Sequence, residues 1–314
     1  MRRLGLALFL VAAACSPAET GESTTTSSGA PTTTVGPATS TSSPVTTTTT
    51  LATTTTVPPT TTTSLLAGNW ADEPLVTTDF GALGWWDGSG WVDAATEGAL
   101  PVVGGEDYQV VRLDFLGSTT AGPQTTRCEP LELLGVALED PELLGSFPGP
   151  YGVAVSAPWA LQPHLLEAFE DDGDYSGFAS EVLASRGLDV DQPVIKQLFR
   201  TDLEGDGVNE VIIVTEDVSD GLFAEVGDYS LAFLRKTVGG SIRNFVLGES
   251  VITDESQLPL VYSFSIGAVA DLNDDGKMEI VVSSAYYEGL AVEVLEYVND
   301  DDGAVVQISQ GCGA

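Results

Sequence analysis

The chain has 314 residues and carries 46 acidic residues against 11 lysines and arginines, which gives a formal net charge of -35. Nucleic-acid binding depends on Lys and Arg to neutralise phosphates, so this charge argues against a nucleic-acid partner and against contact with anionic membrane surfaces. An acidic excess of this size is typical of proteins that bind cations, need high solubility or work in a salt-rich environment.

Residues 1–15 have the pattern of an export signal. Arg2 and Arg3 precede an apolar run at residues 4–14, which is shorter than the roughly 20 residues that a membrane-spanning helix needs. Small residues before Cys15 resemble the bacterial lipobox, in which the cysteine receives a lipid. We therefore expect a lipoprotein signal peptide, lipidation at Cys15 and anchoring at the extracellular face of the cell membrane. Ordinary signal cleavage, with secretion of the free protein, is the alternative.

Residues 16–64 form a low-complexity segment. It contains 22 Thr and 8 Ser and has no aromatic residue, so it cannot bury enough apolar surface to fold. If extended at about 3.1 Å per residue, it would reach on the order of 150 Å. We expect a disordered tether, either a bare spacer or an O-glycosylated stalk. Residues 65–314 remain as the folded domain and are enough for a substantial core.

Two cysteines lie in this domain, Cys128 and Cys312, separated by 184 positions. An even pair in an exported protein indicates a disulfide bond. A catalytic thiol would need a histidine partner, and the chain has a single one, His164. We therefore predict a bond between Cys128 and Cys312.

The apolar patterns predict a mainly β domain with a short two-helix insert. Gly and Asp residues separate short runs of Val, Ile and aromatic residues, as in antiparallel sheets. Two later segments instead repeat their apolar residues every three or four positions, and Gly187 offers a helix C-cap. The expected elements are a hairpin over 83–92, strands over 108–115 and 151–156, and helices over 161–170 and 175–186.

The second half of the domain contains an internal repeat, at about residues 194–250 and 262–311. Each copy places an acidic loop between two apolar runs, and the two loops start 69 residues apart. Two further strands follow in each copy. The repeat therefore predicts two antiparallel meanders of about four strands, the size of a propeller blade.

The two acidic loops have the spacing of calcium-binding loops. Side chains at positions 1, 3 and 5, a carbonyl at position 7 and a carboxylate at position 9 can supply the oxygens that calcium prefers, and Gly at position 6 allows the sharp turn. Magnesium demands stricter geometry, and zinc prefers His and Cys. Acidic Asp-Gly turns without a metal are the alternative. We expect two calcium ions, with the ligands Asp202, Glu204, Asp206, Val208 (carbonyl) and Glu210, and Asp271, Asn273, Asp275, Lys277 (carbonyl) and Glu279.

These loops resemble those of FG-GAP or VCBS repeats, which occur in integrin-α-type β-propellers and in secreted bacterial proteins. The resemblance covers about residues 194–311 and implies one calcium ion per loop. Glu stands at position 9 of both loops and at position 3 of the first, where the family prefers Asp or Asn. Two motifs in a domain of this size are too few for a seven-bladed ring. We therefore expect an incomplete or irregular β-propeller-like domain.

Two classes of function follow from these features. In the first, the protein is a lipid-anchored calcium-binding module that presents its loops to a protein or glycan partner. In the second, it is an exported carbohydrate-active hydrolase that uses carboxylates on the β scaffold. The sequence singles out no catalytic residue, so it favours the first class. Aromatic residues at strand spacing could form either a sugar-stacking face or part of the core: Trp70, Trp85, Trp86, Trp91, Trp159, Tyr286 and Tyr287.

The lipid anchor can be tested in a bacterial host that processes lipoproteins. Replacing the cysteine in Cys15→Ser removes the acceptor for the lipid, so the protein should move from the membrane fraction to the medium. Immunoblots of the two fractions measure the shift. Retention of the variant in the membrane fraction would show that the apolar run at residues 4–14 is itself the anchor.

Overall fold

In the computed structural model, the described residues are 68–313 without 147–148, 172, 220–222 and 257–259. All of them belong to one compact unit, Thr62–Ala314. The expected signal peptide, lipidation at Cys15 and linker over 16–64 lie outside the described residues. Within the described part, the only α-helix is too short and too polar to cross a membrane.

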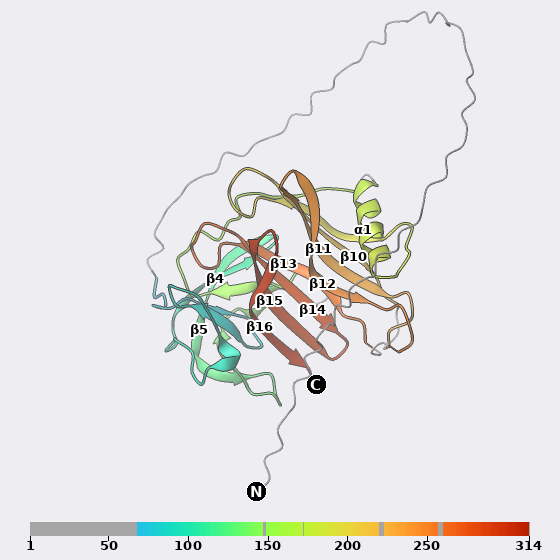
Figure 1. Cartoon of the computed structure of the whole chain (residues 1–314). Helices are drawn as coiled ribbons and strands as arrows, with labels where there is room; N and C mark the ends of the chain where they lie inside the picture. Colours follow the sequence, from blue (N-terminus) through green and yellow to red (C-terminus); the bar gives the residue numbers. More distant parts are fainter. Residues whose placement is uncertain (1–67, 147–148, 172, 220–222, 257–259, 314) are drawn as a thin grey trace, which may run out of the picture. The chain divides into compact units, whose positions relative to one another are not determined.

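The domain is mainly β, as predicted, and its strands form three antiparallel sheets (Figure 1). The first sheet has seven strands in the order β3-β2-β1-β7-β4-β5-β6. Among the described residues, none of the three sheets closes into a barrel. The strands of the first sheet are β1 Leu75–Thr77, β2 Ala82–Trp86, β3 Trp91–Asp93, β4 Asp107–Arg112, β5 Phe115–Arg127, β6 Leu133–Leu138 and β7 Val153–Val155.

The predicted hairpin over 83–92 is confirmed as β2 and β3. The carboxylate of Asp87 accepts hydrogen bonds from the backbone N–H groups of Ser89 and Gly90, which fixes the turn. These hydrogen bonds, with one from the Ser89 hydroxyl, also lower the pKa of Asp87. The expected strand over 108–115 is instead two paired strands, because β4 turns into β5 after Arg112.

The second sheet has five strands in the order β12-β11-β10-β9-β8, and the third has four in the order β13-β14-β15-β16. Each contains a meander of four consecutive strands, β9 to β12 in the second sheet and β13 to β16 in the third. The first meander gains β8 as an additional edge strand. The strands are β8 Leu166–Ala168, β9 Ile195–Thr201, β10 Glu210–Asp217, β11 Tyr229–Val238, β12 Ser241–Val251, β13 Ser263–Ala270, β14 Glu279–Tyr286, β15 Gly289–Asn299 and β16 Gly303–Gly313.

One of the two predicted helices is wrong. The segment 161–170 contains β8, which pairs antiparallel with β9. The exposed edge of β9 offers backbone partners that a short local helix would leave unused. Arg200 of β9 reinforces the pairing, because its guanidinium lies 4.0 Å from the ring centre of Phe169 and its charge faces Glu167 at 3.8 Å.

The other predicted helix is confirmed as α1, Asp174–Ser185. Gly187 follows the C-cap residue Arg186, as expected, and has a φ of 88°. The N–H of Gly187 reaches the carbonyl of Ala184, and that of Leu188 reaches the carbonyl of Leu183. These two hydrogen bonds form a Schellman motif, and the positive φ at its centre favours glycine.

The three sheets and α1 pack in layers. β10 lies between α1 and the third, four-stranded sheet. Its successive side chains point to opposite faces: Ile213 packs against α1, and Ile212 packs against the third sheet. The same alternation occurs in β14, where Ile280 faces the five-stranded sheet and Val281 faces the seven-stranded one. Burial on both faces explains the unbroken apolar runs that follow each acidic loop. A shift of one residue would turn the apolar side chains to the wrong faces, so this burial also fixes the residue at which each acidic loop joins the strand that follows it.

The predicted disulfide bond between Cys128 and Cys312 is present. The two Cα atoms lie 5.7 Å apart, within the usual range for a bridge. Cys312 belongs to β16, and Cys128 directly follows β5. The bond therefore ties the last strand of the chain to the seven-stranded sheet.

Removal of this bond in a Cys128→Ser/Cys312→Ser variant should destabilise the domain by about 2–5 kcal/mol, because a long loop of the unfolded chain is then released. Urea unfolding of the variant and the wild type measures the difference. Two free thiols in the native wild-type protein, found by mass mapping without reductant, would contradict the assignment.

Candidate metal centre

Two nine-residue loops connect the first and second strands of the two meanders. The first loop (202–210) joins β9 to β10, and the second loop (271–279) joins β13 to β14. They are neighbours, because the N–H of Met278 donates to the carbonyl of Leu203 at 2.8 Å. His164 also lies between them, with Nε2 2.9 Å from the carbonyl oxygen of Gly276. The sequence repeat thus becomes a pair of adjacent acidic loops.

The two loops have the same backbone path. At position 6, Gly207 and Gly276 have φ values of 81° and 85°, which explains the glycine that the sequence places there. Position 4 is also left-handed, with φ of 69° at Gly205 and 61° at Asp274. Asp is one of the few residues that tolerate this region. In the first loop a Cβ at position 4 would lie 2.8 Å from Nε2 of His164, so any other residue there would have to displace the imidazole.

Equivalent side chains hold the two loops closed. The carboxylate at position 1 accepts hydrogen bonds from the N–H groups of positions 5 and 6, at 3.1 and 2.9 Å in both loops. The carboxylate at position 5 accepts from the N–H of position 7, at 2.7 and 2.8 Å. One oxygen of the Glu at position 9 accepts from the N–H of position 2, at 3.0 and 2.6 Å. The carboxylates therefore act first as internal caps of their own loops.

The sequence-predicted ligands lie on two separate loops, five residues on each. The position 1 and position 9 carboxylates are buried, whereas those at position 5 are exposed. Val208 and Lys277 occupy position 7 with exposed side chains, so only their backbone carbonyls qualify as ligands. Asn273 at position 3 is buried and its side-chain oxygen accepts the N–H of Asp275 at 3.0 Å. Within the described residues, no three or more His, Cys, Asp or Glu side chains are already gathered as a metal-binding group.

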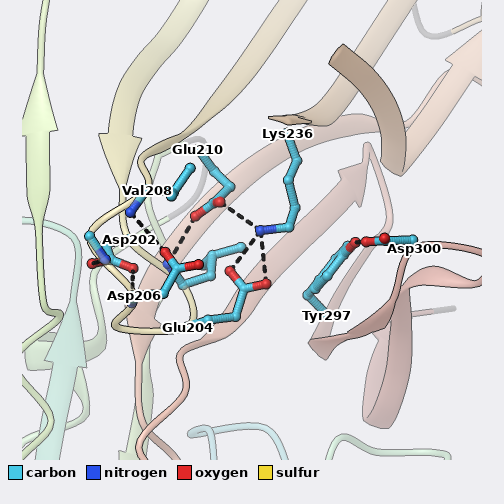
Figure 2. A network of polar contacts seen from close by, with 10 residues as sticks. Asp202, Glu204, Asp206, Val208, Glu210, Lys236, Tyr297 and Asp300 are labelled. Carbon is cyan, nitrogen blue, oxygen red and sulfur yellow. Dashed lines mark hydrogen bonds and ion pairs between the residues drawn. The ribbon is translucent and has the colours of Figure 1, made fainter. Parts of the chain in front are cut away.

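The first loop is in contact with an ammonium group from outside the loop, which was not predicted from the sequence. Lys236 of β11 is 7 % exposed, and its Nζ lies 2.7 Å from Glu210 Oε1 and 2.8 Å from the carboxylate of Glu204 (Figure 2). Nζ also lies 4.9 Å from the ring centre of Tyr297, whose hydroxyl donates to Asp300. Burial acts to lower the pKa of Lys236, but the hydrogen bonds and charges of the two glutamates outweigh it and raise the pKa.

The second loop has a different neighbour at the equivalent place. In the first meander, Val211 pairs with Arg235, so Glu210 lies across from Lys236. In the second meander, Ile280 pairs with Leu295, so Glu279 lies across from Glu296. The second loop therefore faces a glutamate at the register where the first loop faces a lysine. The ion pairs of the described residues include none at this loop.

Glu279 is consequently a buried acid that is only half satisfied. Its side chain is fully buried, and Oε1 has no hydrogen-bond partner, whereas Oε2 accepts from Leu272. Burial raises its pKa well above the ordinary range, and the charges of Asp271, Asp275 and Glu296 raise it further. Lys277 is close enough to Glu296 to lower the pKa of that group, but its side chain is exposed. Such a buried, unpartnered oxygen among carboxylates suits a bound cation.

The chain matches no protein-family model, no curated protein and no solved structure. The resemblance to FG-GAP or VCBS repeats therefore stays a prediction, resting on the loop motifs and their spacing. The cross-strand neighbours Lys236 and Glu296 were not predicted. The available signal was weak, because Lys236 follows Arg235 after the apolar run of β11 and so reads as part of an exposed strand end.

The role of Lys236 as a counter-charge predicts a large loss of stability on its removal. In calcium-free buffer with chelator, Lys236→Met should cost about 3–5 kcal/mol, because it leaves the buried carboxylate of Glu210 without its partner. Lys196→Met, at an exposed lysine of β9 in the same sheet, is the matched control and should cost less than about 0.5 kcal/mol. Urea unfolding measures both. Equal losses would show that the ion pair contributes nothing specific.

Proposed function

We propose that this chain is an exported calcium-binding β module, anchored at the extracellular face of the cell membrane by a lipid on Cys15 and a tether over residues 16–64. The observation that carries the calcium site is Glu279, whose Oε1 is buried without a hydrogen-bond partner beside other carboxylates. A buried charge is costly unless it is paired or bound to a metal. A divalent cation at the second loop would supply the missing partner.

The donor atoms of the second loop favour calcium over other metals. They are the side-chain oxygens of Asp271, Asn273, Asp275 and Glu279 and the carbonyl oxygen of Lys277, all hard ligands. Calcium accepts six to eight such oxygens in flexible geometry, whereas magnesium needs a nearly ideal octahedron. Zinc would prefer His and Cys, and residues 271–279 contain neither.

The architecture supports a blade-like role for the two meanders. Each has its acidic loop between its first and second strands, and the meanders pack face to face through a shared apolar core. This is the arrangement expected of neighbouring FG-GAP or VCBS repeats. We therefore interpret residues 194–311 as two units of an irregular, propeller-like domain that is completed by the seven-stranded sheet.

A cluster of exposed tyrosines supports the proposal of a protein or glycan partner. Tyr286 makes edge-to-face contacts with Tyr262 and Tyr287, at centroid distances of 5.3 and 5.8 Å. Tyr262 is 37 % exposed and Tyr287 is 54 % exposed. Tyrosine is favoured in binding sites because it combines a large apolar ring with a polar hydroxyl. In contrast, Trp85, Trp91 and Trp159 pack in or against the apolar core.

Calcium should therefore stabilise the domain. A ligand that binds only the native state contributes about 2.7 kcal/mol at one hundred times its Kd. For a domain of this size that corresponds to a rise in Tm of about 5–10 °C. Thermal unfolding of the full chain should show this rise on addition of calcium chloride, a return with chelator and a much smaller effect of sodium chloride at equal ionic strength.

Substitution of the central acid identifies the site that is responsible. Glu279→Gln keeps the shape of the side chain but removes its charge, so most of the calcium-dependent rise in Tm should be lost. Glu293→Gln, at a partly buried carboxylate of β15 on the same sheet, is the matched control and should keep the full response. A wild-type Tm that is insensitive to calcium would overturn the proposed function.

A further inference from the structure

The two acidic loops have the same backbone conformation, but the residues that face them across the sheet carry opposite charges. Across from position 9, the first loop has the ammonium of Lys236 and the second loop has the carboxylate of Glu296. Oε1 of the position 9 glutamate shows the consequence. In Glu210 this oxygen is paired with Nζ at 2.7 Å, whereas in Glu279 it has no hydrogen-bond partner.

Lys236 is held in this place by both meanders. Its Nζ contacts two carboxylates of the first loop, and the ring of Tyr297, from β15 of the other meander, lies 4.9 Å away. The hydrogen bond from the Tyr297 hydroxyl to Asp300 fixes that ring (Figure 2). The ammonium is thus surrounded by a carboxylate pair and an aromatic face, the two groups that stabilise a buried cation best.

The side chain at position 3 also differs in charge between the two loops. The first loop has Glu204, where the calcium-loop pattern prefers Asp or Asn, and this longer side chain reaches Lys236 at 2.8 Å. The second loop has Asn273, which is short and neutral and stays folded against its own loop. The unusual glutamate of the first loop is therefore explained as the second partner of the lysine.

We propose that the ammonium of Lys236 takes the place of calcium in the first loop, so that the chain binds a single calcium ion, at the second loop. This inference rests on the proposed calcium binding and narrows it from two ions to one. A lysine ammonium donates hydrogen bonds to the oxygens that a metal would otherwise bind, and its positive charge repels a second cation. The first loop is therefore closed without metal.

A calcium titration of the full chain by calorimetry tests the number of ions. The wild type should bind one ion per chain. Asp275→Asn, at position 5 of the second loop, should weaken that binding at least about tenfold, since it removes a ligand charge. Asp206→Asn, at the same position of the first loop, is the matched control and should leave the affinity and the stoichiometry unchanged.

Two single substitutions test whether the residue across the strand from position 9 decides if a loop binds calcium. Glu296→Lys places an ammonium across from Glu279 and should abolish calcium binding while the protein stays folded, as shown by its circular dichroism. Lys236→Glu recreates the second loop's neighbour in the first loop and should yield two bound ions. The assignment does not depend on the folding of the second variant, because the wild type and the Asn variants decide the stoichiometry.

The outcomes separate the two proposals. No calcium bound by the wild type would overturn the calcium-binding function itself. Two ions, one lost in each Asn variant, would leave that function in place and overturn the substitution by Lys236. A single ion that is lost in Asp206→Asn but kept in Asp275→Asn would also overturn it. One ion lost only in Asp275→Asn and in Glu296→Lys would support both.

Discussion

A buried glutamate at the start of a buried strand is the constraint on which both meanders depend. Glu210 begins β10 and Glu279 begins β14, and both are fully buried. Each uses one oxygen to hold the loop before it, through the N–H of position 2. The strand that follows is buried on both faces, so neither carboxylate can turn to water. A charged carboxylate at either place is stable only with a cation beside its second oxygen, and burial raises the pKa of both groups.

The two meanders meet this need in different ways. The first supplies Lys236 from its own third strand, so its loop can close as soon as the meander folds. The second presents Glu296 at the equivalent register, and Oε1 of Glu279 has no hydrogen-bond partner. The N–H of Met278 in the second loop donates to the carbonyl of Leu203 in the first. Because of this hydrogen bond, an ion bound in the second loop would also stabilise the first.

Local sequence patterns predicted most strands and α1, since each depends on apolar periodicity and on turn residues such as Gly187. They failed at residues 161–170, where the decisive factor is the free edge of β9 rather than any local preference. They also could not place β7 between β1 and β4, a pairing of distant segments. The disulfide was predictable because Cys128 and Cys312 were the only pair that remained after Cys15.

The site was predictable in its loops but not in its charges. The spacing predicted two tight loops with glycine at position 6, and both have a left-handed backbone at that glycine. The charge that faces each loop comes from the residue across the sheet, and that residue lies outside the loop motif. Lys236 is 26 positions beyond Glu210, and only the strand register brings the two together. The unusual Glu204 becomes intelligible only with that partner in place.

The most direct measurement is a crystal structure of the folded domain grown with calcium, with anomalous scattering to locate the ions. The account predicts one calcium ion, bound in the second loop by oxygens at about 2.3–2.6 Å that include Glu279 Oε1, and the ammonium of Lys236 in the first loop. An anomalous peak in both loops, or none in the second, would contradict it.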